Sequence, residues 1–163
     1  MKKTLPTLGT AVLHHITAIG YNSFTFPSKI INHGSDEYIP IVVCEYDGKE
    51  HFLVLPVHYD DGEKDLTNYN DSPPMAFNEA LKNALTEHTS FILDCKKALY
   101  AGSFTSTERS FHVHVLKLEN VYEEPVWEKG NSNPKKYGAA VWLPIQDYTH
   151  LLTTITQQAL KLY

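Results

Sequence analysis

The fold is decided by the stretch PMAFNEALKNALTEHTSF, which runs from Pro74 to Phe91. Ser72 precedes the stretch as a helix cap, and Pro73 suits a first helical turn. Apolar residues and one histidine recur at the spacing that gathers side chains on one face of a helix. These residues are Phe77, Leu81, Ala84, Leu85 and His88. The stretch therefore predicts an amphipathic helix.

A hairpin of two strands is predicted before this helix. Tyr38–Tyr46 and His51–Val57 are rich in β-branched and aromatic residues, and Asp47 and Gly48 lie between them. Asp-Gly supplies the positive φ angles that a tight turn between strands requires. The buried surface of the hairpin is predicted to come from Ile39, Ile41, Val42, Val43, Phe52, Leu53, Val54 and Leu55.

Further elements are predicted after the helix. Ala98–Phe104 and Ser110–Leu118 indicate a second hairpin, and Gly138–Pro144 indicates a short apolar strand. Asp147–Leu162 is predicted to form a terminal helix with one apolar face. That face consists of Leu151, Ile155, Ala159 and Leu162. Strands on both sides of one helix, closed by a second helix, predict an α/β (α+β) fold in which a mixed sheet is sandwiched between helices.

The length of 163 residues fits one domain. The chain has no internal repeat, and its longest polar stretch, Asp60–Pro74, is too short for an interdomain linker. We therefore expect one domain spanning 1–163, with an N-terminal extended segment over 1–37. Within that segment Gly9–Phe26 is predicted to be extended, with a turn at Gly20–Ser23.

Composition and charge narrow the range of partners. The chain has 14 basic and 19 acidic residues, a formal net charge of −5, and Arg109 is its only arginine. Because the guanidinium group of arginine makes the bidentate contacts to phosphate and guanine, and the chain has one arginine, nucleic acid is a disfavoured partner. Cys44 and Cys95 are the only cysteines and fit a reducing compartment. No apolar run reaches the ~20 residues of a membrane span, so the expectation is a cytoplasmic protein without a membrane partner.

Three pieces of the chain resemble the Nudix hydrolase superfamily. The hairpin Tyr38–Val57 leads into a helix, Glu79–Phe91, similar to the family's helix of the form AAxRELxEETGL. Leu99–Phe104 followed by Phe111–Leu118 is similar to the hairpin after the Nudix box. Val141–Ile145 is similar to the family's Trp-x-Pro segment before its last helix. The resemblance covers roughly Ile39 to Tyr163 and implies a Nudix-like fold.

The Nudix box itself is degenerate in this chain. With Leu85 on the box leucine, Ala84 replaces the first glutamate, Glu87 matches the second and His88 replaces the third. The remaining box positions also depart from the pattern, because the arginine, the final glycine and the upstream glycine and glutamate are replaced. The replacements are Asn83, Ser90, Tyr69 and Met75, unless Gly62-Glu63 is the upstream element displaced by an insertion.

The family's chemistry requires several carboxylates on one helical face, because Mg²⁺ prefers oxygen ligands and bridges to phosphates. The resemblance implies that Mg²⁺ or Mn²⁺, if bound, would be held by Glu87 and His88 together with Glu79. Catalytic carboxylates would be Glu87 with Glu123 or Glu124. For Glu87 the alternative is an ordinary solvated side chain.

The polar stretch Glu119–Lys136 and the tyrosine after it offer candidate substrate-binding residues. Trp127 and Tyr137 can stack on a nucleobase, and Lys129 can meet a phosphate. An ordinary solvated loop is the alternative interpretation.

His112, His114 and Glu119 have the spacing HxHxxxxE. On a strand the two histidines point to one face, an arrangement that metal-binding cupins use. The flanking glycines of the cupin pattern are absent, and a long amphipathic helix precedes the motif. These residues are an alternative metal site, and the competing interpretation is two polar residues on a half-exposed strand.

Three functions remain open from the sequence. The first is a Nudix-fold protein related to hydrolases of nucleoside diphosphate-linked substrates, which if active would be a divalent-metal-dependent nucleotide pyrophosphohydrolase. The second is a catalytically inactive Nudix-like module that binds a nucleotide or a protein partner, and the replacements at Met75, Ala84 and Ser90 motivate it. The third is a cupin-like metal-binding protein.

Overall fold

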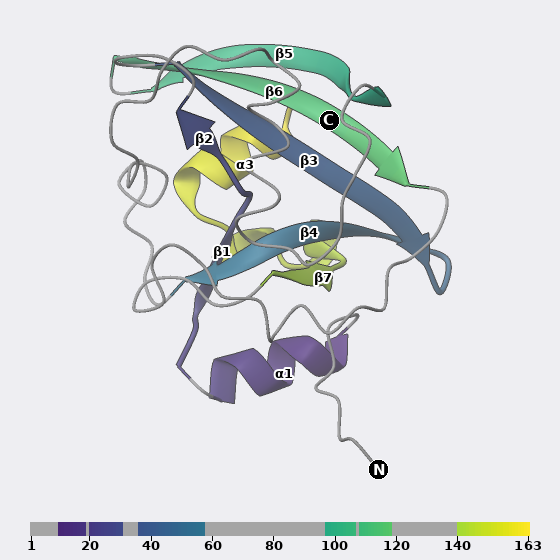
Figure 1. Cartoon of the computed structure of the whole chain (residues 1–163). Coiled ribbons are helices and arrows are strands. Elements are labelled where there is room, and N and C mark those ends of the chain that lie inside the picture. The colour runs from purple at the N-terminus through teal and green to yellow at the C-terminus, as the bar shows by residue number, and fades with distance from the viewer. Residues whose placement is uncertain (1–9, 19, 31–35, 58–96, 107, 119–139) are drawn as a thin grey trace.

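A mixed β-sheet forms the centre of the structure (Figure 1). The computed structural model describes residues 10–18, 20–30, 36–57, 97–106, 108–118 and 140–163. The strands in these ranges are β1 (Ser23–Thr25), β2 (Lys29–Ile30), β3 (Asp36–Tyr46), β4 (Lys49–Val57), β5 (Leu99–Ser106), β6 (Arg109–Leu118) and β7 (Val141–Leu143). The helices are α1 (Thr10–Ala18) and α3 (Thr154–Leu160), and two 3-10 turns are η4 (Ile145–Asp147) and η5 (Thr149–Leu151).

The first hairpin, β3 and β4, is confirmed. Tyr46 pairs with Lys49 across a turn of two residues. The φ angles are 53° at Asp47 and 77° at Gly48. Positive φ at both central positions belongs to the type I′ turn, whose twist matches that of the flanking strands. The local sequence therefore determines this turn.

The two strands of this hairpin diverge after a short paired stretch. β3 and β4 pair only from the turn to Val43 and Phe52. Further along, β1 pairs with the end of β4 and β2 pairs with the start of β3, so residues 23–30 bridge the diverging strands (Figure 1). β6 runs parallel to β3 on its other side, and β5 pairs antiparallel with β6 as the second predicted hairpin. The parallel pairing of β3 with β6 beside antiparallel pairs makes the sheet mixed, as predicted.

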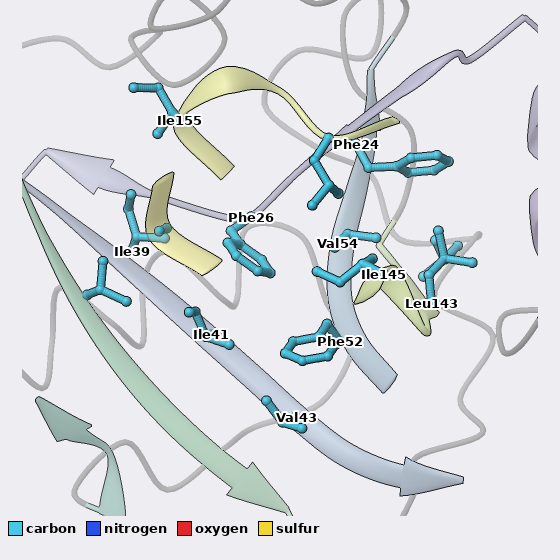
Figure 2. Packing of buried hydrophobic residues seen from close by; sticks show 14 of the residues in the cluster. Phe24, Phe26, Ile39, Ile41, Val43, Phe52, Val54, Leu143, Ile145 and Ile155 are labelled. Atoms are coloured by element: carbon cyan, nitrogen blue, oxygen red, sulfur yellow. The ribbon is translucent and has the colours of Figure 1, made fainter. Parts of the chain in front are cut away.

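One face of the sheet, the α3 face, carries the larger apolar cluster. Figure 2 shows Ile39, Ile41 and Val43 following one another along β3, with Phe26 and Phe52 beside them. All five side chains are 2% exposed or less. Full burial of a side chain of this size contributes ~1.5–3 kcal/mol. The same cluster includes residues of the helices and turns, namely Ile16, Ile145, Ile155 and Ala159.

The opposite face, the histidine face, holds the alternate residues of the same strands. Its apolar members form a second buried cluster that includes Val42, Cys44, Leu53, Leu55, Val57, Leu116 and Trp142. His112 and His114 alternate with the α3-face residues of β6 and therefore share the face of Leu116. Burial on both faces explains why the middle of β3 is almost continuously apolar.

The extended structure predicted for 1–37 is wrong at α1, which is a helix of nine residues. Its C-terminal end has the hydrogen bonds of a Schellman motif, from the Tyr21 N–H to the Ile16 carbonyl and from the Gly20 N–H to the Thr17 carbonyl. The glycine that suggested a turn between strands is therefore a helix terminator. Ile16 is fully buried in the α3-face cluster, and this burial outweighs the strand preference of the β-branched residues around it.

The terminal helix begins later than the predicted start at Asp147. η4 and η5 occupy the predicted first turns, and α3 follows them. Leu152 forms an isolated parallel bridge with Phe24 of β1, which holds the chain extended before α3. Thr153 is the N-cap, and its hydroxyl oxygen accepts from the Thr156 N–H at 3.4 Å. The cap and the bridge together set the start of the helix.

Three buried threonines fix α3 against β1. The Thr156 hydroxyl oxygen lies 2.8 Å from the hydroxyl oxygens of both Thr25 and Thr153. It also accepts from the Phe26 N–H at 3.1 Å. The Thr153 N–H donates to the Phe24 carbonyl at 2.9 Å. The network gives buried polar groups the partners that burial demands.

The helix predicted over Pro74–Phe91 lies outside the described residues, as does the loop Glu119–Lys136. Within the described ranges, no helix is long and apolar enough to cross a membrane.

Candidate functional site

Two tyrosines and two histidines form an aromatic cluster on the histidine face, which we name the Tyr–His cluster: Tyr38, Tyr100, His112 and His114. The Tyr38 ring contacts His112 and His114 edge-on, with centroid distances of 5.6 and 5.3 Å. The Tyr100 ring lies 6.5 Å from the His112 ring and 5.1 Å from the His114 ring. These distances are within the range of interacting aromatic pairs, so each histidine contacts both tyrosines.

Strand pairing brings the four side chains together. Tyr38 lies opposite His112 in the parallel pair of β3 and β6. Tyr100 lies opposite His114 in the antiparallel pair of β5 and β6. Because residues two apart on a strand share a face, the two histidines stand side by side between the tyrosines. The cluster thus depends on three neighbouring strands.

A β-bulge in β5 sets the direction of Tyr100. Tyr100 pairs with His114, and Gly102 pairs with the residue before His114, so Ala101 is an extra residue. Gly102 has a φ of 142°, a conformation that side chains rarely allow. A Cβ atom at Gly102 would lie 3.4 Å from Leu162. The bulge therefore directs Tyr100 toward the histidines while Gly102 lies against the C-terminal segment.

His114 is the buried centre of the Tyr–His cluster, and Tyr100 and His112 form its more open rim. His114 is 7% exposed, whereas Tyr100 is 59% exposed. Burial lowers the pKa of His114 to about 4, and the charge of the neighbouring His112 adds to the shift. His114 is therefore neutral at pH 7. A neutral imidazole has one nitrogen that donates and one that accepts a hydrogen bond.

The shared face of His112 and His114 agrees with the sequence analysis, but their predicted partner Glu119 lies outside the described residues. Among the residues that the structure describes, no group of three His, Cys, Asp or Glu side chains could hold a metal ion. The cupin alternative requires a β-barrel, and a mixed sheet with helices is a different architecture. A metal role for the histidine pair stays a prediction.

Sequence reasoning missed the two tyrosines of the cluster. The signal for Tyr100 was Gly102, since a glycine inside a strand often marks a bulge. Tyr38 gave no comparable signal, because its position beside His112 depends on the parallel pairing of β3 with β6.

The other predicted site residues lie outside the described part of the chain, and their roles stay predictions. They are Glu79, Glu87, His88, Glu123, Glu124, Trp127, Lys129 and Tyr137.

A buried ion pair lies at the start of β3 and β6. Arg109 forms a salt bridge with Glu37, whose side chain is fully buried. The Ser28 hydroxyl donates to the other carboxylate oxygen of Glu37 at 3.4 Å. The Arg109 guanidinium also lies 5.1 Å from the centroid of the Phe111 ring. The only arginine of the chain is therefore engaged inside the protein, and this arrangement supports structure more directly than anion binding.

A shallow hollow at the β3–β4 turn is lined by Gly48, Lys49, Glu50, Pro144, Gln146 and Asp147. Its charged groups are already paired within the protein. The Lys49 ammonium lies 2.9 Å from the Asp147 carboxylate, and the Tyr163 hydroxyl donates to Glu50. The Tyr–His cluster is the stronger candidate, because its rim combines exposed aromatic surface with polar ring atoms.

Comparison with solved structures identifies the architecture. The Nudix domain of NrtR from Shewanella oneidensis, solved in complex with ADP ribose, matches this chain with a TM-score of 0.56. The two are 10% identical, and the match covers 80% of this chain and 86% of that one. The chain has a Nudix-like fold.

Two further structures have lower TM-scores. A C. elegans Ap4A hydrolase in a binary complex matches with a TM-score of 0.48. The two are 12% identical, and the match covers 79% of this chain and 94% of that one. The T. brucei MERS1 protein in complex with RNA also matches with a TM-score of 0.48. The two are 11% identical, and the match covers 87% of this chain and 58% of that one. No family model matches the sequence, and no curated protein matches it significantly. The Nudix-like fold therefore rests on three-dimensional likeness.

Proposed function

We propose that this chain is a Nudix-like module that binds a nucleotide on the histidine face of its sheet. The Tyr–His cluster carries the proposal, because it presents aromatic rings at a partly open rim above a neutral histidine. Aromatic side chains bind bases by stacking, with ~1–3 kcal/mol per base. The ADP ribose in the NrtR Nudix domain supports a nucleotide as the ligand class.

The degenerate Nudix box favours binding over catalysis. Of the three box glutamates that align within the predicted helix, only Glu87 is kept, while Ala84 and His88 occupy the other positions. A hard divalent cation is usually held by several oxygen ligands. Loss of these ligands weakens a metal site without removing the surface on which a base can stack.

A thermal-shift titration with ADP-ribose, ADP and UDP tests the proposal, performed once in EDTA and once in MgCl₂. We expect the melting temperature to rise with nucleotide concentration in EDTA, since a ligand that binds only the folded state stabilises it. The same samples are analysed for product, and none is expected. Stabilisation by none of the nucleotides would contradict the proposal and favour a protein partner.

A second candidate function is metal-dependent hydrolysis, which the retained Glu87 favours. Glu87, His88 and Glu79 would hold Mg²⁺ or Mn²⁺, and Glu123 or Glu124 would assist a water molecule. When bound, such a cation neutralises phosphate charge and lowers the pKa of bound water. Release of product with Mg²⁺ or Mn²⁺, abolished by Glu87→Gln and kept by Glu108→Gln in the β5–β6 turn, would establish hydrolysis in place of simple binding.

A further inference from the structure

We infer that the Tyr–His cluster is the subsite for the base of a purine nucleotide, and that Tyr100 is the ring on which the base stacks. The inference rests on the proposed nucleotide binding and adds to it the residues and the part of the ligand that they contact.

The geometry of the rim fits a bicyclic ring. The Tyr100 and His112 rings have centroids 6.5 Å apart and planes inclined by 36°. They belong to adjacent strands and stand on one face of the sheet, so a flat ligand at this rim can contact both side chains. A bicyclic purine offers more ring area for contact with these two side chains than a monocyclic pyrimidine. Stacking free energy grows with this contact area.

The cluster is also supported in the way that a stacking platform requires. Tyr100 is 59% exposed, yet its ring is held 5.1 Å from that of the nearly buried His114. Tyr38 meets His112 and His114 with interplanar angles of 89° and 66°. These edge contacts fix the histidine rings from the β3 side. The rim therefore offers an open ring on a rigid base, which limits the entropy lost on binding.

The charges around the Tyr–His cluster favour contact with the base of a nucleotide over contact with its phosphates. Glu37 of β3 and Arg109 and Lys117 of β6 alternate with the residues of the histidine face and therefore lie on the opposite face of the sheet. Glu37 and Arg109 pair with each other there, and the Lys117 ammonium lies 5.5 Å from the Tyr163 ring centroid. His114 is neutral at pH 7 because burial lowers its pKa. Aromatic rings around a neutral His114 suit the face of an uncharged base better than a phosphate, whose strong contacts are with cations.

Isothermal titration with ADP, UDP and ribose 5-phosphate tests the inference on the full chain. We expect ADP to bind about tenfold more tightly than UDP, and ribose 5-phosphate to bind more weakly than either. Tyr100→Ala should weaken ADP binding about tenfold and remove the preference over UDP. Tyr100→Phe, which keeps the ring, should retain both. Leu99→Ala is the matched control, because Leu99 is the neighbouring exposed residue, directed to the other face of the strand.

The outcomes separate this inference from the proposed function. Equal affinities for ADP and UDP, or unchanged ADP affinity in Tyr100→Ala, would overturn the purine subsite and leave nucleotide binding intact. Binding of no nucleotide by the wild-type chain would overturn both. If Tyr100→Ala lowers the melting temperature of the free protein, the His112→Ala variant decides the question. It removes the second ring of the rim and should weaken the binding of ADP more than the binding of UDP.

Discussion

Tyr100 lies directly opposite His114 on the neighbouring strand, and their ring centroids are 5.1 Å apart. This relationship depends on Ala101, the extra residue of the bulge. In a regular strand Tyr100 and Gly102 would share a face, because side chains alternate with a period of two. The bulge places Tyr100 on the histidine face while Gly102 lies against Leu162. A local backbone irregularity thus determines whether the cluster has its exposed ring.

Gly102→Ala is expected to destabilise the protein by about 1–2 kcal/mol, because a residue with a side chain is strained at a φ of 142°. Urea denaturation followed by circular dichroism measures the change in the free energy of unfolding. Ser103→Ala, at the adjacent exposed position, should change it by less than about 0.5 kcal/mol. Equal midpoints for the two variants would show that the bulge does not require glycine.

Acid is expected to destabilise the fold through His114. Its pKa is lowered to about 4 in the folded state, mainly by burial, whereas an unfolded histidine titrates near ~6.5. Between these values the unfolded state binds more protons. The contribution of His114 to stability is therefore complete above about pH 6.5 and decreases as the pH falls toward 4, by up to about 3 kcal/mol.

Denaturation midpoints measured between about pH 4 and pH 7 check this dependence. His114→Leu should flatten the part of the curve between pH 4 and 6.5. His14→Leu, at an exposed position of α1, should leave that part unchanged. A wild-type curve that is flat over this interval would contradict the prediction.

Elements determined by short-range patterns were predictable from the sequence. The Asp47-Gly48 turn and the alternation in β6 both act over a few residues, and both hairpins are confirmed. α1 was missed because Gly20 indicates a turn equally well after a strand or after a helix, and the burial of Ile16 that favours the helix is a tertiary effect. The late start of α3 depends on Thr153, whose role as a cap requires the contact with β1.

The candidate site was less predictable than the fold. Period-two alternation was enough to place His112 and His114 on one face. The contribution of Tyr38 requires parallel pairing between strands separated by some 70 positions in the chain, and no local pattern specifies that partner. The contribution of Tyr100 requires a shift of one residue in register, which a single glycine suggests but does not locate.

Removal of the Arg109 guanidinium is expected to destabilise the protein strongly. Arg109→Met leaves the fully buried Glu37 carboxylate without its cation, a change that typically costs ~3–5 kcal/mol. The double variant Glu37→Gln, Arg109→Met should be more stable than Arg109→Met, because it buries no charge. A double-mutant cycle from chemical denaturation measures the coupling.

Lys97→Met, at an exposed lysine, controls for the general effect of removing one positive charge and should be close to neutral. If the single Arg109 variant and the double variant were equally destabilised, the loss would arise from the packing of the side chain on Phe111, and the ion pair would not be its source.

Thr156→Val is expected to lower the free energy of unfolding by about 1–3 kcal/mol, because it removes the hydroxyl that accepts from the Phe26 N–H and contacts Thr25. Thr156→Ser keeps the hydroxyl and should recover most of the loss. Thr154→Val, an exposed position of the same helical turn, is the matched control. Equal unfolding midpoints for Thr156→Val and Thr154→Val would contradict the assignment. The network joins β1 to α3 without contacting the Tyr–His cluster, so the ADP affinity of the folded Thr156→Val protein should equal that of the wild type.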